Sequence, residues 1–282
     1  MYPIAISTAE TPVTDAMLIA CREAGITCVE LSYDPEVYDA MDLDATVALI
    51  RSYGIEVWSL HMPFGPALDI SVPDPEVNAG ALSYLSRLME RSRAAGITRL
   101  IIHPSFEPIT DEERPARMAQ AKASLARLAD VAEALGATLA VEDLPRSCLG
   151  NCSSEMLELL DAYPALRSCF DTNHLLGENA ADYVRRVGPR IITTHVSDYD
   201  FVNERHWLPG EGGQDFLAIL KALEEVGYDG VWLYELGLST PTTIIRPRQI
   251  TYSDIADNAH TLFSGRTPAP IGKPKEGLGM WG

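Results

Sequence analysis

The sequence has few basic residues. Its 22 Lys and Arg stand against 40 Asp and Glu, which gives a formal net charge of −18. A chain this acidic repels the phosphate backbone of nucleic acids and the anionic surface of a membrane. We therefore expect neither a nucleic acid nor a membrane as a partner.

Long apolar runs and paired cysteines are also missing. No apolar run reaches 18 residues, so we expect no membrane-spanning helix. The N-terminus lacks the basic region of a signal peptide, and residues 2–7 are typical of a strand instead. The five cysteines are scattered and form no CxxC pair, which favours reduced thiols in a cytoplasmic protein. The sequence leaves open whether the chain forms a homo-oligomer.

What the chain does contain is a regular alternation of strand-like and amphipathic segments. Eight apolar, strand-like runs recur along it: residues 3–8, 27–33, 55–64, 99–105, 138–145, 166–174, 191–198 and 230–237. Between them lie stretches with apolar residues at three- and four-residue spacing, such as residues 78–95 and 116–135, and many of these stretches end at a glycine. A doubly wound sheet usually has fewer strands and a glycine-rich turn after the first one, which residues 6–10 do not offer.

This alternation predicts the α/β fold class and a single (β/α)8 TIM barrel. A chain of 282 residues is long enough, since such a barrel needs about 250 residues. We place the barrel domain at residues 1–265, with its last helix over residues 253–263. Residues 266–282 hold four Gly and three Pro, which predicts an extended arm or a disordered end.

Four of the strand-like runs end in a side chain that can bind a metal ion. These side chains are Glu142, Asp171, His195 and Glu235, which lie 29, 24 and 40 residues apart. That spacing is roughly one strand plus one helix, and the carboxyl ends of barrel strands meet at one end of the barrel. We therefore predict that the four side chains bind one divalent ion. Oxygen and imidazole ligands suit Mn, Zn, Mg or Co with little selectivity.

Five of the six histidines also fall at or after strand ends: His61, His103, His174, His195 and His206. For any one of them, a hydrogen-bonded histidine without a metal is as good an explanation as a ligand. The recurrence of ligand types at successive strand ends makes that explanation much weaker for the four-residue set. For His61 and His103, metal binding and a neutral, hydrogen-bonding role in the pocket both stay open.

With these strand-end ligands, the chain resembles the xylose isomerase-like TIM-barrel superfamily. That superfamily includes sugar isomerases and epimerases, inosose dehydratase and the endonuclease IV type of abasic-site nuclease. In the ketose 3-epimerase branch, a Glu, an Asp, a His and a Glu at successive strand ends bind one ion. The resemblance implies these roles for the four ligands predicted above. The Asp-Thr-x-His motif of that branch is matched by residues 171–174 and implies that His174 contacts a substrate oxygen. Two further substrate contacts of that branch, a Glu and an Arg, are replaced here by Cys148 and Phe201.

The nuclease branch of the superfamily is matched at other positions. It binds three metals with two extra histidines, which resemble His61 and His103. Its Asp-Arg-His segment before a Gly-x-Gly turn resembles Glu204-Arg205-His206, with Glu in place of Asp. A net charge of −18 is unsuited to gripping duplex DNA, so the extra histidines are expected to be substrate contacts or additional ligands.

Together, these features predict a metal-dependent isomerase or epimerase that acts on a small-molecule sugar or sugar phosphate through an enediolate. Glu142 and Glu235 are the expected catalytic residues, one taking a proton and the other returning it. The expected substrate contacts are His61, His103, His174, His206 and Arg205. The alternatives are a lyase or hydrolase of the same superfamily, resembling inosose dehydratase or endonuclease IV, and a barrel that binds a metal or sugar without catalysis.

The sequence leaves open whether the sugar is phosphorylated. Residues 210–213 form a Gly-Glu-Gly-Gly turn before a helix, where backbone N–H groups bind phosphate in many barrels. Arg205, Arg246 and Arg248 are nearby sources of positive charge, although solvent-facing loop arginines explain them equally well. Glu211 within the turn disfavours a dianion.

Overall fold

The computed structural model describes residues 1–9 and 11–280, and its eight main strands confirm the predicted barrel. These strands are parallel and follow the order β7-β6-β5-β4-β3-β2-β1-β8. Their bounds are β1 Ile4–Ser7, β2 Cys28–Ser32, β3 Glu56–His61, β4 Arg99–Ile102, β5 Thr138–Glu142, β6 Arg167–Asp171, β7 Ile191–His195 and β8 Trp232–Tyr234. The ring closes because Val196 N donates to Leu233 O at 2.7 Å and Glu235 N donates to Val196 O at 3.2 Å.

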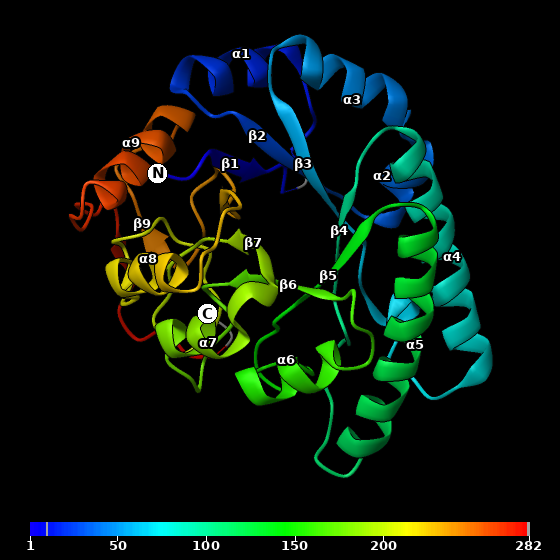
Figure 1. The fold of residues 1–282 in the computed structure, drawn as a ribbon. Coiled ribbons are helices and arrows are strands. Elements are labelled where there is room, and N and C mark those ends of the chain that lie inside the picture. Colours follow the sequence, from blue (N-terminus) through cyan, green and yellow to red (C-terminus); the bar gives the residue numbers. More distant parts are fainter. Residues whose placement is uncertain (10, 281–282) are drawn as a thin grey trace.

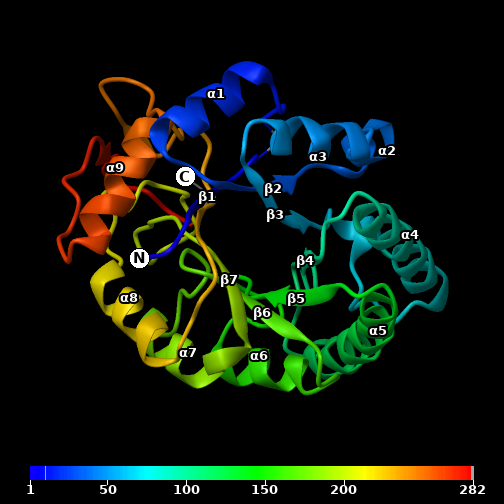
Figure 2. The same ribbon diagram turned by 45° about the horizontal axis from the view of Figure 1, so that its top comes forward.

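Helices form an outer ring around these strands (Figures 1 and 2). Their bounds are α1 Asp15–Ala24, α2 Pro35–Ala40, α3 Leu43–Ser52, α4 Pro75–Ala94, α5 Arg114–Ala134, α6 Ser153–Leu160, α7 Ala180–Val187, α8 Phe216–Glu225 and α9 Tyr252–Phe263. Two 3-10 turns, η1 Pro66–Leu68 and η2 Gly188–Arg190, complete the connections. Among the described residues, none of these helices combines the length and the apolar character that a membrane crossing requires.

Capping residues, rather than the spacing of apolar residues, determine where the helices begin and end. The sequence predicted a helix from residue 78, but α4 begins at Pro75 because the Asp74 side chain caps it, accepting the N–H groups of Glu76 and Val77. A glycine ends α1 in a similar way: Gly25, at its C-terminus, adopts φ 83°, a left-handed conformation that residues with a side chain disfavour.

The strands carry an apolar layer inside the barrel and a polar layer above it. Residues two apart in a strand point to the same side, so five apolar residues each have a polar residue above them, toward the carboxyl end. The pairs are Cys28 and Glu30, Ile101 and His103, Ala140 and Glu142, Cys169 and Asp171, and Leu233 and Glu235. This two-residue step is what gathers the polar side chains at one end of the barrel.

The segment after α9 runs back across that same end as an extended arm. Its short strand β10 Lys273–Pro274 pairs antiparallel with β9 Ile244–Ile245. Farther along, Gly279 O accepts a hydrogen bond of 2.7 Å from Arg205 Nη2. The sequence allowed either an extended arm or a disordered end here, and the described residues form the arm.

Candidate functional site

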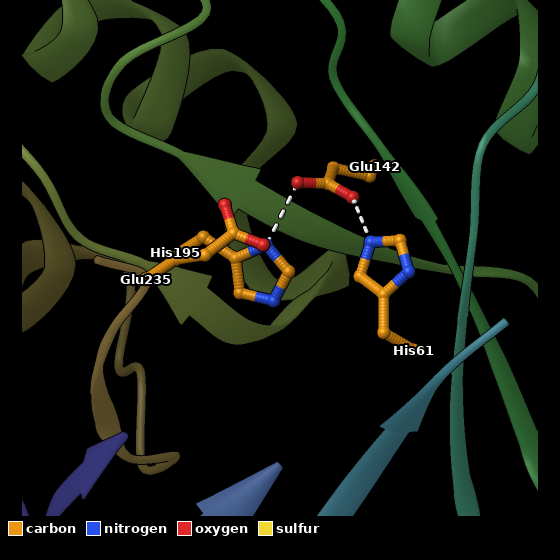
Figure 3. A group of neighbouring side chains, drawn as sticks. All are labelled: His61, Glu142, His195 and Glu235. Atoms are coloured by element: carbon orange, nitrogen blue, oxygen red, sulfur yellow. Dashed lines mark hydrogen bonds and ion pairs between the residues drawn. The ribbon is translucent and has the colours of Figure 1, made fainter. Parts of the chain in front are cut away.

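The four expected metal ligands converge at the carboxyl end of the barrel. Glu142 ends β5, Asp171 ends β6, His195 ends β7 and Glu235 follows β8. Measured from His195 Nδ1, the nearest carboxylate oxygens lie at 2.7 Å for Glu142, 3.5 Å for Glu235 and 4.0 Å for Asp171. Figure 3 shows three of these side chains facing one another, with His61 beside them.

The two oxygens of the Glu142 carboxylate face different histidines. Oε1 faces His195, whereas Oε2 lies 2.9 Å from His61 Nε2 and 3.1 Å from His103 Nε2. Two groups each bring one ligand atom per residue to within 4.8 Å of one another: His61, Glu142, His195 and Glu235, and Glu142, Asp171 and His174. Glu142 belongs to both groups and is therefore the centre of the cluster.

The outward-facing nitrogens of His61 and His195 make hydrogen bonds that show which ring nitrogens are left for a cation. His61 Nδ1 lies 2.9 Å from the carbonyl of Met62, which only accepts, so Nδ1 carries the hydrogen. His195 Nε2 likewise faces the carboxylate of Glu30 at 3.1 Å. The inward nitrogens, His61 Nε2 and His195 Nδ1, then point lone pairs at Glu142. That arrangement is repulsive unless a proton or a cation lies between them.

The charges of the buried cluster also call for a cation. Burial raises the pKa of the Asp171 carboxyl well above its ordinary value, and its buried Oδ2 accepts no hydrogen bond from the described residues. Burial would raise the pKa of Glu142 as well, but His195, His103 and His61 hold that pKa well below its ordinary value. A buried carboxylate oxygen without a partner, beside imidazole nitrogens, is the donor set of a divalent-ion site. The residues present therefore fit such an ion.

His174 lies beside this cluster and is tied to two acceptors. Its Nδ1 lies 2.7 Å from the carbonyl of Asp143 and its Nε2 lies 3.2 Å from Glu204 Oε2. Burial would lower the pKa of His174, but Asp171 and Glu204 raise it well above its ordinary value. The ring is thus held as a cationic donor at the edge of the site. Glu204 also pairs with Arg146 Nη2 at 2.9 Å.

Two cavities that share lining residues lie over the cluster. One, of about 280 Å³, is lined by Glu142, His103, His174 and Glu204, among others. The other, of about 350 Å³, extends toward Tyr33 and Leu236 at the ends of β2 and β8. The residues that line both cavities are His61, Phe64, His206 and Glu235. Four of the expected substrate contacts, the histidines 61, 103, 174 and 206, therefore face this space.

Arg205, the fifth expected substrate contact, is placed differently from its neighbours. Its guanidinium bonds Asp200 Oδ2 at 2.9 Å and the carbonyl of Gly279 at 2.7 Å, and it lines neither cavity. The backbone turns sharply at the next residue, His206, whose φ of 51° is in the left-handed region. The turn at His206 directs the imidazole inward while the preceding guanidinium stays with the arm.

The Gly-rich turn that could hold a phosphate already holds a carboxylate. Asp198 accepts the backbone N–H groups of Gly210, Gly212 and Gln214 at 2.9, 2.8 and 3.1 Å. Two arginines near the turn are paired as well: Arg246 with Glu211 and Arg248 with Asp254. The donors that the sequence offered to a phosphate are therefore used within the protein.

Sequence reasoning did not assign a role to two buried carboxylates of the site. Glu30 faces His195 from β2, and Asp143 Oδ1 accepts the N–H of Asp171 at 2.7 Å. Burial raises the pKa of Asp143 to about 8. A charged residue in the middle of an otherwise buried strand, as in Val29-Glu30-Leu31, is the signal that would have identified Glu30.

Comparison with known proteins agrees with this geometry. A family model described as a xylose isomerase-like TIM barrel matches residues 18–253. The chain is 27% identical over 234 residues to a ketose 3-epimerase of Arthrobacter globiformis, covering 80% of this chain and 77% of that protein. It is 30% identical over 216 residues to an L-ribulose 3-epimerase of Mesorhizobium japonicum, covering 73% and 70%. A solved structure of a D-tagatose 3-epimerase-like protein has a TM-score of 0.79 at 20% identity, covering 94% of this chain and 97% of that chain, which shows a shared fold.

Proposed function

Because the chain belongs to the xylose isomerase-like TIM-barrel family, we propose that it is a metal-dependent sugar epimerase or isomerase. The observation that carries the proposal is the convergence of three carboxylates on His195 Nδ1, within 4.0 Å, beneath an open cavity. Relatives named as ketose and L-ribulose 3-epimerases cover most of the chain and support the same class of reaction.

The ion would be held by Glu142, Asp171, His195 and Glu235. When bound, a divalent ion polarises a substrate carbonyl as a Lewis acid and makes the hydrogen on the adjacent carbon more acidic. His174 lines the same cavity, and its Nε2–H, which faces Glu204 Oε2 at 3.2 Å, would be shared with or passed to a substrate oxygen.

Glu142 and Glu235 are placed to move the proton. Both line the cavity of about 280 Å³, so a sugar carbon there lies within reach of two carboxylates. One of them accepts the proton from the carbon next to the carbonyl, which leaves an enediolate. The other, protonated by exchange with water, returns a proton. Return to the opposite face of the same carbon gives the epimer, whereas return to the neighbouring carbon gives the aldose–ketose isomer.

The charges around the cavity favour an uncharged sugar over a phosphorylated one. Arg146 lines the cavity but is shared between Glu107, at 2.5 Å, and Glu204, at 2.9 Å. Two carboxylates beside one guanidinium leave no net positive charge for a phosphate. The second cavity is lined by Asp34 and Glu235, and none of the described residues that line it is a Lys or Arg. We therefore infer a free ketose or aldose as the substrate.

Hydrogen exchange tests the proposal directly. The protein is loaded with Mn²⁺ and incubated in D2O with a panel of free ketoses and aldoses, the paramagnetic ion is removed, and ¹H NMR follows deuterium incorporation. Deuterium in one C–H position of one sugar, together with the epimer or isomer, supports the proposal. Binding of a sugar with no exchange and no product would show a barrel that binds without catalysis.

A specific observation favours a second candidate, a metal-dependent phosphoesterase. His61 Nε2 and His103 Nε2 both face Glu142 Oε2, while Oε1 faces the main cluster, so a second cation fits on the other side of the carboxylate. Two or more ions suit phosphate ester hydrolysis, because they hold the attacking and the leaving oxygen. The net charge of −18 makes duplex DNA a poor substrate for such an enzyme.

Metal analysis separates the two candidates. The epimerase predicts about one equivalent per chain, lost in His195→Ala and retained in His206→Ala. Two or three equivalents, reduced in His103→Ala and accompanied by cleavage of a phosphate ester, would favour the phosphoesterase.

A further inference from the structure

Glu30 is a fully buried carboxylate whose position the proposed reaction does not explain. It lies in the middle of β2 with 0% of its surface exposed. Ionised carboxylates are costly to bury unless they are paired. Its partners are Ser59, whose Oγ donates to Oε2 at 2.6 Å, and His195, whose Nε2 lies 3.1 Å from Oε1 and 3.2 Å from Oε2. Both partners lie inside the barrel.

Glu30 is not a member of the group that would hold the ion. It lines neither cavity, so it does not touch a sugar in either of them. It also has no place in the two ligand groups of the described residues, since His195 lies between it and Glu142. The direct contact between Glu30 and the ligand group is therefore the one to the His195 ring.

The two nitrogens of His195 have different partners, and Glu30 decides which of them carries the hydrogen. An ionised carboxylate only accepts, so His195 Nε2 must donate to it. The hydrogen on Nε2 leaves the lone pair of the neutral ring on Nδ1, and Nδ1 is the atom 2.7 Å from Glu142 Oε1. Ser59 donates to Glu30 Oε2 and so keeps the carboxylate turned toward the ring.

We propose that Glu30 is a positioning residue that fixes His195 as the Nε2–H tautomer and so creates the histidine ligand of the metal site. This inference rests on the proposed function, because it assigns a role within that metal site. A carboxylate behind a histidine orients the ring and makes the inward nitrogen a stronger ligand. Ser59 supports Glu30 in this role.

The first test measures metal affinity rather than turnover. Mn²⁺ is titrated into the metal-free protein in competition with a chelating dye. We expect Glu30→Gln to weaken binding about 10- to 100-fold, since loss of such an outer partner typically has this effect. Ser59→Ala should weaken it less, because the Glu30 carboxylate stays opposite His195 and loses only one hydrogen bond.

A matched control removes a buried carboxylate elsewhere. Asp69 is 5% exposed and pairs with Arg117 away from both cavities. Asp69→Asn should lower the melting temperature and leave the affinity for Mn²⁺ unchanged. Equal affinity in wild type and Glu30→Gln would overturn the proposal. So would an equal loss in Glu30→Gln and Asp69→Asn, since it would trace the effect to stability.

The second test needs no variant that could fail to fold. In metal-free wild-type protein, at a pH at which the His195 ring is neutral, ¹⁵N NMR of the histidine rings should show a hydrogen on His195 Nε2 and none on Nδ1. A hydrogen on Nδ1 instead would overturn the proposal. Its failure is distinguishable from that of the proposed function, because tight metal binding with the wrong tautomer contradicts only the role of Glu30. Absence of sugar exchange in a protein with the expected tautomer contradicts only the epimerase.

Discussion

Asp198 accepts the backbone N–H of Gly212 at 2.8 Å and thereby closes a turn that could otherwise receive an anion. A Cβ at Gly212 would lie 2.4 Å from Asp198 Oδ1 and 2.3 Å from the carbonyl of Tyr199, so only glycine lets the carboxylate approach this closely. The protein thus supplies its own anion to the N–H groups ahead of α8. This contact therefore bears on whether the protein can bind a phosphorylated sugar.

We predict that phosphorylation of the sugar lowers its reactivity. The turn is filled by Asp198, and Arg146 is shared by two carboxylates, so neither offers its hydrogen-bond donors to a phosphate. Deuterium exchange should be slower for a ketose phosphate than for the corresponding free ketose at equal concentration. Faster exchange of the phosphate would show that the donors rearrange around it.

We predict that the Glu142→Gln and Glu235→Gln variants keep the fold and lose proton transfer. Removal of an acid–base group typically lowers the rate by about 10²–10⁴-fold. Exchange is measured at saturating Mn²⁺ so that weaker metal binding does not limit the rate, and circular dichroism checks the fold. Undiminished exchange in either variant would mean that its carboxylate does not move the proton.

His174→Ala should weaken sugar binding more than metal binding. The ring faces the cavity as a charged donor, and loss of a hydrogen bond to a charged group costs about 1.5–3 kcal/mol, or roughly 10- to 100-fold in affinity. Calorimetric titration with the sugar and dye competition with Mn²⁺ give the two affinities. A larger loss of Mn²⁺ affinity would assign His174 to the metal instead.

Asp143 should make the stability of the metal-free protein depend on pH. Burial raises its pKa to about 8, against about 4 in an unfolded chain. Between these values the folded protein keeps a proton that the unfolded chain has lost. The stabilisation is therefore complete below about pH 4 and declines as pH rises through about 8, by at most about 1.4 kcal/mol per pH unit. Urea unfolding across this window should give a flatter pH profile for Asp143→Asn, and an unchanged profile would refute the assignment.

The spacing of strand ends predicted most of the cluster because it depends on local structure. Glu142, Asp171, His195 and Glu235 each follow an apolar strand, and parallel strands bring such positions to one end of the barrel. For Glu142, Asp171 and Glu235, an apolar residue two positions earlier in the strand shows which side chain points inward, whereas Thr193 holds that place before His195.

The rest depended on contacts between residues far apart in the chain. Glu30 meets His195 across 165 residues, a pairing that no local pattern encodes. Arg205 sits between Glu204 and His206, which both line the cavity. Its guanidinium nevertheless turns to the arm, because Asp200 and the carbonyl of Gly279 are its partners. A sequence motif gave the position of Arg205 on the loop but not the direction of its side chain.

The arm also has a consequence for how the protein is made. Arg205 and Asn203 flank Glu204, and they bond the carbonyls of Gly279 and Met280. A ribosome must therefore add 74 residues after Arg205 before the partner carbonyl exists. All eight barrel strands precede that point in synthesis, so the barrel can close before the loop that carries Glu204 is anchored. Truncation of the arm should therefore disturb the Glu204 loop at the pocket before it disturbs the barrel.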